Sequence, residues 1–192
     1  MKQKMAIGAL LLIGMFTVSR TATAQENPSG EMPTHTGKGK VTEAVDTKKG
    51  AIFDIGGGIT ILLPQGLPVG SSRVLTLKKA PNRPKPTQIH KRFQRYGETV
   101  IFTGALGTAG KPIVLSMSVK KSPQKSGYKL VLAIEEAGLC SGENKKYNIG
   151  KGLCSVWRTV DAEYDASEKR VVAKLTSTGG HRLQFGWIPE TE

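Results

Sequence analysis

The fold is decided most clearly by one stretch near the C-terminus, VWRTVDAEYDASEKRVVAKL, which spans residues 156–175. Its first part alternates, so that Val160 and Tyr164 share one face of an extended chain and Trp157 lies on the other. The last five residues alternate in the same way, and the polar run 165–169 between the two parts is typical of a turn. The stretch therefore predicts a β-hairpin with one buried face, in which Trp157 is a partly buried packing residue.

Short runs rich in apolar and β-branched residues recur on the N-terminal side of this hairpin and once more after it, separated by Gly, Pro and Asn. No interval holds a convincing apolar run at the helical period of 3.6 residues. The candidate strands are nine in number, at residues 51–55, 59–63, 73–77, 98–102, 113–119, 129–135, 155–164, 170–176 and 182–188. Many short strands with Gly and Pro turns predict an all-β fold, namely an antiparallel β-sandwich of about nine strands.

The N-terminus has the order of features found in a secretory signal peptide. Lys2 and Lys4 precede an apolar run of 13 residues at 6–18, and residues 22–24 supply small side chains for cleavage. The apolar run is shorter than the roughly 20 residues of a membrane span. We therefore expect residues 1–24 to be removed, the product to be exported to the periplasm or the extracellular space, and no later segment to span a membrane.

The exported part is expected to be basic. Residues 25–44 are rich in Pro, Gly, Thr and charge and predict a flexible lead-in, followed by a single domain at 45–192. The whole chain has 28 Lys and Arg against 15 Asp and Glu, and the signal peptide takes away three basic residues and no acids. The remaining 25 basic and 15 acidic residues give a net charge of +10. Such a charge favours contact with polyanions, and simple solubility is the alternative.

The two cysteines, Cys140 and Cys154, both lie in the part expected to be exported, where disulfides form and persist. The segment 141–153 between them contains three Gly and few apolar residues, which predicts a loop. A structural zinc site would need a nearby His, and a redox pair would more often have Cys-x-x-Cys spacing. We therefore expect one structural disulfide, which restricts the unfolded chain by roughly 3 kcal/mol in the entropic account.

Motifs for cofactors, metals and catalysis are weak. Gly56, Gly57 and Gly58 precede a strand, whereas a phosphate-binding loop would need a helix there, so they predict a tight turn. Residues 107–112 lack the Ser or Thr of a P-loop and predict a hairpin connection. The histidines have no metal-ligand spacing and lie outside any Ser or Cys nucleophile motif. These histidines are His35, His90 and His181. We expect no cofactor, no metal site and no catalytic residue.

Three parts of the chain follow a recognisable order. IGGGITILLPQGLPVG at residues 55–70 has glycines, an alternating strand and a Pro-x-Gly-apolar-Pro turn, and KPIVL follows at 111–115. The tail continues from Trp157 through residues 162–165 to His181. This order resembles the ZU-type β-sandwich domain of ankyrins, netrin receptors and tight-junction scaffolds, in the form of a bacterial exported relative. The resemblance implies the sandwich fold and a module that docks or holds surfaces without catalysis, and it implies no particular partner.

The segment 78–95 is the part of the sequence that points most clearly to a function. Prolines hold its first part near polyproline geometry, and Phe93 and Tyr96 are interleaved with its last cations. Its charged residues are all basic, namely Lys78, Lys79, Arg83, Lys85, Lys91, Arg92 and Arg95. This composition predicts an anion-binding arm, and the alternative is a solvated loop whose charge keeps the sheet edge from aggregating. If the arm binds, loss of its last three cations should cost more affinity than loss of three lysines elsewhere. The lysines chosen for that comparison are Lys120, Lys121 and Lys125.

We therefore expect an exported, non-enzymatic module with a binding or structural role. An acidic glycan, an anionic lipid surface and a protein remain open as partners, and the oligomeric state is open too. One alternative is a cell-envelope protein that binds polyanions through residues 78–95. Another is an envelope hydrolase with scattered catalytic residues, although the acidic pairs Glu135–Glu136 and Asp161/Glu163 are predicted at strand edges or in turns. A hydrolase needs titratable groups that converge in a cleft, whereas a docking module would present a flat or convex surface.

Overall fold

The structure is a computed structural model, and it describes residues 32–67, 74–80, 89, 91–104, 111–176 and 180–190. The predicted signal peptide lies outside these residues, as do Arg83, Lys85 and His90 of the basic segment. The described residues form a 12-stranded sheet and one short 3-10 helix. The all-β prediction is therefore confirmed, with more strands than the nine expected.

The strands follow one another along the chain with short connections. Their bounds are β1 (Thr34–Thr36), β2 (Lys40–Ala44), β3 (Ala51–Asp54), β4 (Ile59–Leu63), β5 (Val74–Lys79), β6 (Gln94–Thr103), β7 (Ile113–Ser118), β8 (Tyr128–Leu139), β9 (Asn148–Gly150), β10 (Leu153–Asp165), β11 (Arg170–Leu175) and β12 (Gly180–Pro189). The 3-10 helix, Gly142–Tyr147, lies between β8 and β9. Hydrogen bonding orders them β1-β3-β4-β7-β11-β10-β8-β12-β6-β5-β2, with β9 added beside β10.

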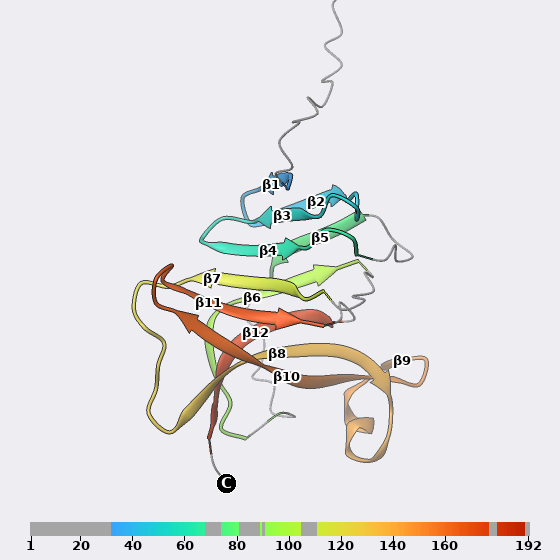
Figure 1. The fold of residues 1–192 in the computed structure, drawn as a ribbon. Helices are drawn as coiled ribbons and strands as arrows, with labels where there is room; N and C mark the ends of the chain where they lie inside the picture. Colours follow the sequence, from blue (N-terminus) through green and yellow to red (C-terminus); the bar gives the residue numbers. More distant parts are fainter. Residues whose placement is uncertain are drawn as a thin grey trace, which may run out of the picture. The chain divides into compact units, whose positions relative to one another are not determined.

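This sheet curls until its two ends nearly meet (Figure 1). The end strands β1 and β2 are joined by a short turn in which Gly37 N donates to Asp54 O at 2.8 Å. On the other side of the turn, Lys79 N donates to Gly39 O at 2.9 Å. The architecture is therefore one nearly closed sheet. It departs from a strictly antiparallel arrangement at one point among the described strands, because β1 and β3 run parallel.

Alternating side chains fill the inside of the curled sheet with a continuous apolar core, which includes Phe53, Leu75, Phe102 and Leu132. The opposite face of β8 is also buried, because Val131 and Ala133 pack there against Phe93 in a second cluster. A Cβ atom added to Gly186 would lie 2.3 Å from Cζ of Phe93, so only glycine leaves room for this ring on β12. Strand β8 is therefore covered on both faces.

The sheet begins earlier in the chain than the sequence predicted. Residues 34–44 were expected to belong to a flexible lead-in, but they form β1 and β2. Val41 is 5% exposed in the main core, and the ring of His35 lies 5.3 Å from that of Phe53. A strand of five residues with one buried side chain has too little alternation to stand out from a solvated segment.

The hairpin predicted at residues 156–175 is present as β10 and β11, with Ala162 opposite Ala173. Its turn is held by the Asp165 carboxylate, which accepts hydrogen bonds from the hydroxyl of Ser167 at 2.6 Å and from the backbone N–H of Ser167 and Glu168. These bonds, above all the one from the Ser167 hydroxyl, lower the pKa of Asp165 below its usual range. Trp157 is partly buried against the second cluster, as predicted.

Two connections between strands differ in structure from what the sequence predicted. The segment between the cysteines is not a plain loop, because it contains the 3-10 helix and β9. Strands β6 and β7 do not form a hairpin, since β6 lies between β12 and β5 while β7 lies between β4 and β11. Residues 105–110 of that connection lie outside the described residues. The glycines at 56–58 do form the predicted tight turn, with φ angles of 74°, 68° and 72°.

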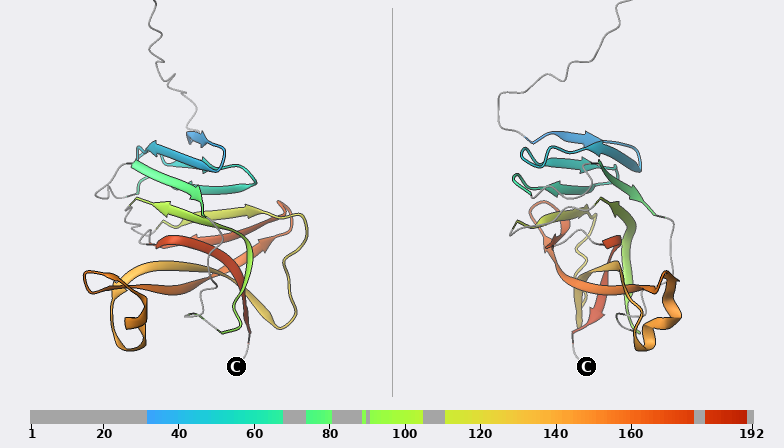
Figure 2. Two further views of the ribbon diagram at one scale, coloured as in Figure 1. Left: turned by 180° about the vertical axis from the view of Figure 1, so that it is seen from behind. Right: turned by 90° about the vertical axis from the view of Figure 1, so that its right-hand side faces the viewer.

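Both cysteines are joined in the predicted disulfide, Cys140 to Cys154. The bond closes the base of the segment that carries β9, where Cys140 N also donates to Gly152 O at 3.1 Å. Strands β8 and β10 lead out to this tip on the side away from the β7–β8 connection (Figures 1 and 2). None of the helices in the described part of the chain has the length and apolar character that a membrane span requires.

Candidate ligand-binding groove

The described cations of segment 78–95 are divided among three elements. Lys78 and Lys79 belong to β5, Lys91 and Arg92 to a turn, and Arg95 to β6. The ring of Phe93, which the sequence suggested as part of an anion-binding surface, is only 1% exposed and belongs to the second cluster. This ring therefore packs the scaffold and is closed to a ligand. The anion-binding role of the cations themselves stays a prediction.

A different basic segment lies over an open hollow. The connection between β7 and β8 forms one wall of a hollow of about 530 Å³, and the rings of Tyr96 and Trp187 form the other. The connection contributes Lys120, Lys121 and Lys125 to that wall. Among the described residues that line this hollow, none is acidic. It therefore offers three ammonium groups and two aromatic rings to one ligand.

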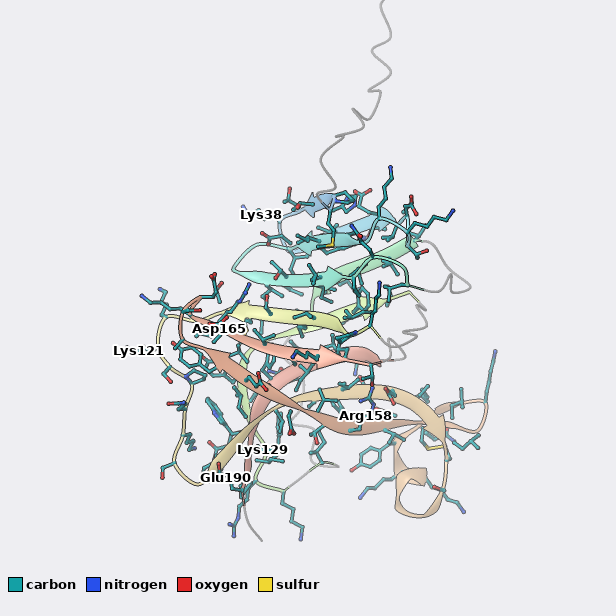
Figure 3. The ribbon with its side chains drawn as sticks, in the orientation of Figure 1. Lys38, Lys121, Lys129, Arg158, Asp165 and Glu190 are labelled. Atoms are coloured by element: carbon teal, nitrogen blue, oxygen red, sulfur yellow. A yellow bond between two sulfur atoms is a disulfide. The ribbon has the colours of Figure 1, made fainter. Side chains whose placement is uncertain are left out.

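A second hollow of about 650 Å³ adjoins the first and shares four wall residues with it. The shared residues are Pro123, Gln124, Lys125 and Trp187. Its wall adds two further tyrosines, Tyr128 and Tyr164, and charges of both signs. Figure 3 labels Lys121, Lys129 and Glu190, which come from the β7–β8 connection, from β8 and from the chain just beyond β12. We call the two hollows together the lysine–aromatic groove.

The β7–β8 connection is held in place by a few specific bonds. Trp187 donates from its indole Nε1 to the backbone oxygen of Pro123 at 2.8 Å, and Pro123 is buried. The connection's other end is fixed where Glu190 N donates to Gly127 O at 3.1 Å. Because an indole N–H that is partly shielded from water favours a protein partner, the same bond that satisfies Trp187 also fixes the lysine-bearing wall.

Lys125 lies at the junction of the two hollows. Its Nζ is 4.2 Å from the centre of the Tyr128 ring and 5.8 Å from that of Trp187. The same ammonium donates a hydrogen bond to the side-chain oxygen of Gln94. A cation over an aromatic face contributes about 0.5–1 kcal/mol at an exposed site. Lys125 is therefore positioned before any ligand arrives.

Tyr96 is positioned by an irregularity in β6. The register between β6 and β12 shifts between Gln184 and Gly186, and the buried amide of Gln184 donates to the backbone oxygen of Tyr96 at 3.0 Å. The Gln184 side-chain oxygen accepts a hydrogen bond from the hydroxyl of Thr99. The Tyr96 ring packs edge-on against Trp187 with centres 4.8 Å apart. Burial, with a smaller contribution from Tyr164, raises the pKa of the Tyr96 phenol above its ordinary value.

The acids in the groove come from β10 and the chain beyond β12, namely Asp161, Glu163 and Glu190. Asp161 forms an ion pair with Lys129 at 2.7 Å, with the Lys129 side chain about half exposed and that of Asp161 largely exposed. The sequence placed Asp161 and Glu163 at a strand edge or in a turn. They lie instead on β10, which has β8 on one side and β11 on the other. Such exposed acids are acceptors for ligand hydroxyl groups.

The other acidic pair, Glu135 and Glu136, also lies within a central strand, β8. The prediction that this pair lies at a strand edge or in a turn is therefore wrong. Ser155 donates to Glu135 Oε1 at 2.5 Å, and Arg182 Nη1 lies 2.6 Å from Glu135 Oε2 without hydrogen-bond alignment. On the other face, Arg158 Nε donates to Glu136 Oε1 at 2.8 Å. These contacts join neighbouring strands and neutralise both carboxylates.

The described residues hold no group of three or more His, Cys, Asp or Glu side chains that could bind a metal ion. No protein-family model matches the chain, and a search of curated proteins finds no match. The groove must therefore be interpreted from its own geometry. The protein is an all-β chain, and its open groove brings lysines, aromatic rings and a few acids together.

Sequence reasoning missed this groove. It treated Lys120, Lys121 and Lys125 as cations remote from any site, whereas they line the groove's wall. The run KKSPQKSGYK at residues 120–129 contains one tyrosine among its lysines, which is a weak signal. The remaining rings come from β6, β10 and β12, and only the strand pairing brings them to the same end of the sheet.

Proposed function

We propose that the protein is an exported, non-enzymatic binding module that holds an acidic glycan in the lysine–aromatic groove. The observation that carries this proposal is the meeting of Lys120, Lys121 and Lys125 with the rings of Tyr96 and Trp187 in one hollow. Pockets that bind small ligands are concave and mostly apolar, with a small number of polar groups that fix orientation. The first hollow has this composition.

A sugar ring suits the chemistry of the groove. Its C–H faces pack on aromatic rings, while its hydroxyl groups pair with donors and acceptors around the edge. Acceptors are supplied by Asp161, Glu163 and Glu190, and donors by the lysines. A carboxylate or sulfate group on the sugar would pair with the ammonium groups of the first hollow, where charge-assisted hydrogen bonds are stronger than neutral ones.

The same acids disfavour a continuous polyphosphate such as nucleic acid. A strand that follows the groove would pass from the three lysines of the first hollow to the carboxylates of the second. Grooves that bind single strands are instead positive along the whole backbone path. A ligand with isolated acid groups among neutral hydroxyls avoids this repulsion, and an acidic glycan is such a ligand.

Two other functions stay as alternatives. Polyanion binding through residues 78–95 is supported by the exposure of Lys79, Lys91 and Arg92. An envelope hydrolase would draw on the acids that line the second hollow, and an open groove is nearer to the cleft expected of a hydrolase than to the flat or convex surface expected of a docking module. The resemblance to ZU-type domains agrees with a binding role and adds no ligand. Export itself rests on the predicted signal peptide, and the disulfide is compatible with it.

The proposal is tested by fluorescence titration of a variant in which Trp157 is replaced by Phe, so that Trp187 is the remaining tryptophan. We expect a heparin-derived hexasaccharide to change the Trp187 emission and a neutral hexasaccharide to bind at least about tenfold more weakly. Equal affinity for both sugars, or no change in emission, would contradict the proposal. Appearance of shorter sugars in the mixture by mass spectrometry would favour the hydrolase alternative.

A further inference from the structure

The tip of the β8–β10 hairpin leaves apolar side chains in water. Three large apolar side chains are exposed in the described residues, namely Val74 (52%), Leu139 (81%) and Ile149 (59%), and two of them belong to this tip. Single exposed apolar residues are ordinary on a protein surface. Two within one small structural unit, both more than half exposed, need a reason.

The two side chains belong to the same tip, Leu139 at the end of β8 and Ile149 on β9. Ala137 and Leu139 are two residues apart on β8 and therefore point to the same side of the strand. Ala137 and Ile149 line one small hollow of about 140 Å³. Leu139 is also paired with Leu153 of β10, which adds a half-buried apolar side chain beside it.

The tip also carries several lysines. Residues 139–153 contain Lys145, Lys146 and Lys151 and one acid, Glu143. All three lysines are exposed, two of them in the last turn of the 3-10 helix. The ammonium of Lys146 lies 5.1 Å from the centre of the Tyr147 ring. The tip thus carries two exposed apolar side chains and three exposed lysines.

The tip is also held in shape. The Cys140–Cys154 disulfide closes its base, β9 pairs with β10, and Gly150 N donates to the Asn148 side chain at 2.6 Å. A surface that is already ordered loses little conformational freedom on binding. The groove lies at the other end of β8, up to roughly 35 Å away for a strand of this length, so the tip is a separate feature (Figures 1 and 2).

We propose that this tip docks on an anionic lipid surface, with Leu139 and Ile149 inserted among the headgroups and the three lysines paired with lipid phosphates. Surface attachment of this kind combines buried apolar area with attraction between basic residues and anionic lipid, and neither contribution suffices alone. The charge of the tip matches this occupant, because lipid headgroups supply negative charge above an apolar layer. The inference is independent of the groove and its ligand.

Vesicle sedimentation of the disulfide-bonded protein tests the proposal. We expect binding to an equal mixture of phosphatidylcholine and phosphatidylglycerol and little binding to phosphatidylcholine alone. Replacing both Leu139 and Ile149 with Ser should weaken binding at least about tenfold. The matched control is Val74→Ser, which removes a similarly exposed side chain from β5 and should leave binding unchanged.

The charge contribution has its own control. Replacing Lys145, Lys146 and Lys151 with Ser should weaken binding about tenfold or more. The same net change is made by replacing Lys38, Lys40 and Lys48, three exposed lysines on and around β2, and should cost much less. Equal losses from the two triple variants would overturn the proposal, because only overall charge would then matter. So would unchanged binding after loss of Leu139 and Ile149, or absence of binding to the anionic vesicles.

Insertion is tested directly by Leu139→Trp. Its emission should shift to the blue with anionic vesicles and be quenched by lipids brominated in the acyl chains, whereas Val74→Trp should show neither effect. A Leu139→Trp protein that binds the vesicles without either change would show that the tip stays outside the apolar layer, and the proposal would fail.

Discussion

Two connections of this chain are rich in basic residues, and their aromatic neighbours differ in how deeply they are buried. The connection from β5 to β6 turns Phe93 inward, where the ring seals the second apolar cluster against Gly186. The connection from β7 to β8 carries Lys120, Lys121 and Lys125 and faces rings that stay half-exposed. The first contains more basic residues, four against three in the second. The second lines the hollow in which we propose that a ligand binds.

The difference shows that charge alone does not locate a ligand site. Lysine and arginine remain at the surface in either connection because burying an unpaired charge is costly. An aromatic side chain carries no charge, so it can either pack in the core or contact a ligand. Phe93 is buried and cannot stack on a ligand, whereas Trp187 is only partly buried and can contact one.

The largest effect is expected from Phe93→Ala. Removal of a ring that is 1% exposed should lower the free energy of unfolding by about 3–5 kcal/mol, because the cavity over β8 and β12 cannot collapse completely. The measurement is urea unfolding followed by circular dichroism. Replacing Lys91 and Arg92 together with Ser should change the same quantity by less than about 0.5 kcal/mol. If Phe93→Ala were as stable as the parent protein, the packing role of this ring would be wrong, and its predicted role in the anion-binding arm would be favoured again.

A smaller effect is expected from the ionisation of Tyr96. Its pKa in the folded protein is raised above the ordinary 10.0, chiefly by burial, so the unfolded chain loses this proton first as pH rises. Stability contributed by the neutral phenol is therefore complete below pH 10.0 and is lost as pH rises through the folded-state pKa. Tyr96→Phe removes the ionisation. The unfolding free energy of the parent should thus fall relative to that of Tyr96→Phe above pH 10.0, and parallel curves would contradict the burial of this phenol.

Local patterns in the sequence predicted much of the fold. The alternation at residues 156–175 predicted β10 and β11 because both strands have one buried face, and the cysteines predicted their bond. Strands β1, β2 and β9 were missed since each has five residues or fewer and at most one buried side chain. Closure of the sheet through β1 and β2 depends on pairings between distant segments, which no local pattern records.

The candidate site was less predictable than the fold. Tyr96, Tyr164 and Trp187 come from three strands far apart in the chain. From the sequence, Tyr96 was placed beside the cations of segment 78–95 and Tyr164 in the predicted hairpin, and Trp187 was given no role. Their meeting depends on the register shift between β6 and β12 and on the indole bond to Pro123. The basic segment 78–95 was conspicuous because its residues are contiguous, which is a property of the sequence and carries no information about a cavity.

The central claim, that the ligand is held beside the β7–β8 connection, is tested most directly by two variants of equal net charge. In one, Lys120, Lys121 and Lys125 become Ser, and in the other Lys79, Lys91 and Arg92, which are exposed in the β5–β6 region, become Ser. Arg95 is left in place because it is half-buried in β6. The measurement is the affinity for the heparin-derived hexasaccharide by calorimetry.

We predict that the first variant loses at least about tenfold in affinity, since charge-assisted hydrogen bonds contribute roughly 1.5–3 kcal/mol each, and that the second loses less than about threefold. A larger loss in the second variant would move the site to the β5–β6 connection, as the sequence predicted. Equal losses would show that overall charge alone attracts the sugar, and either result would contradict the groove.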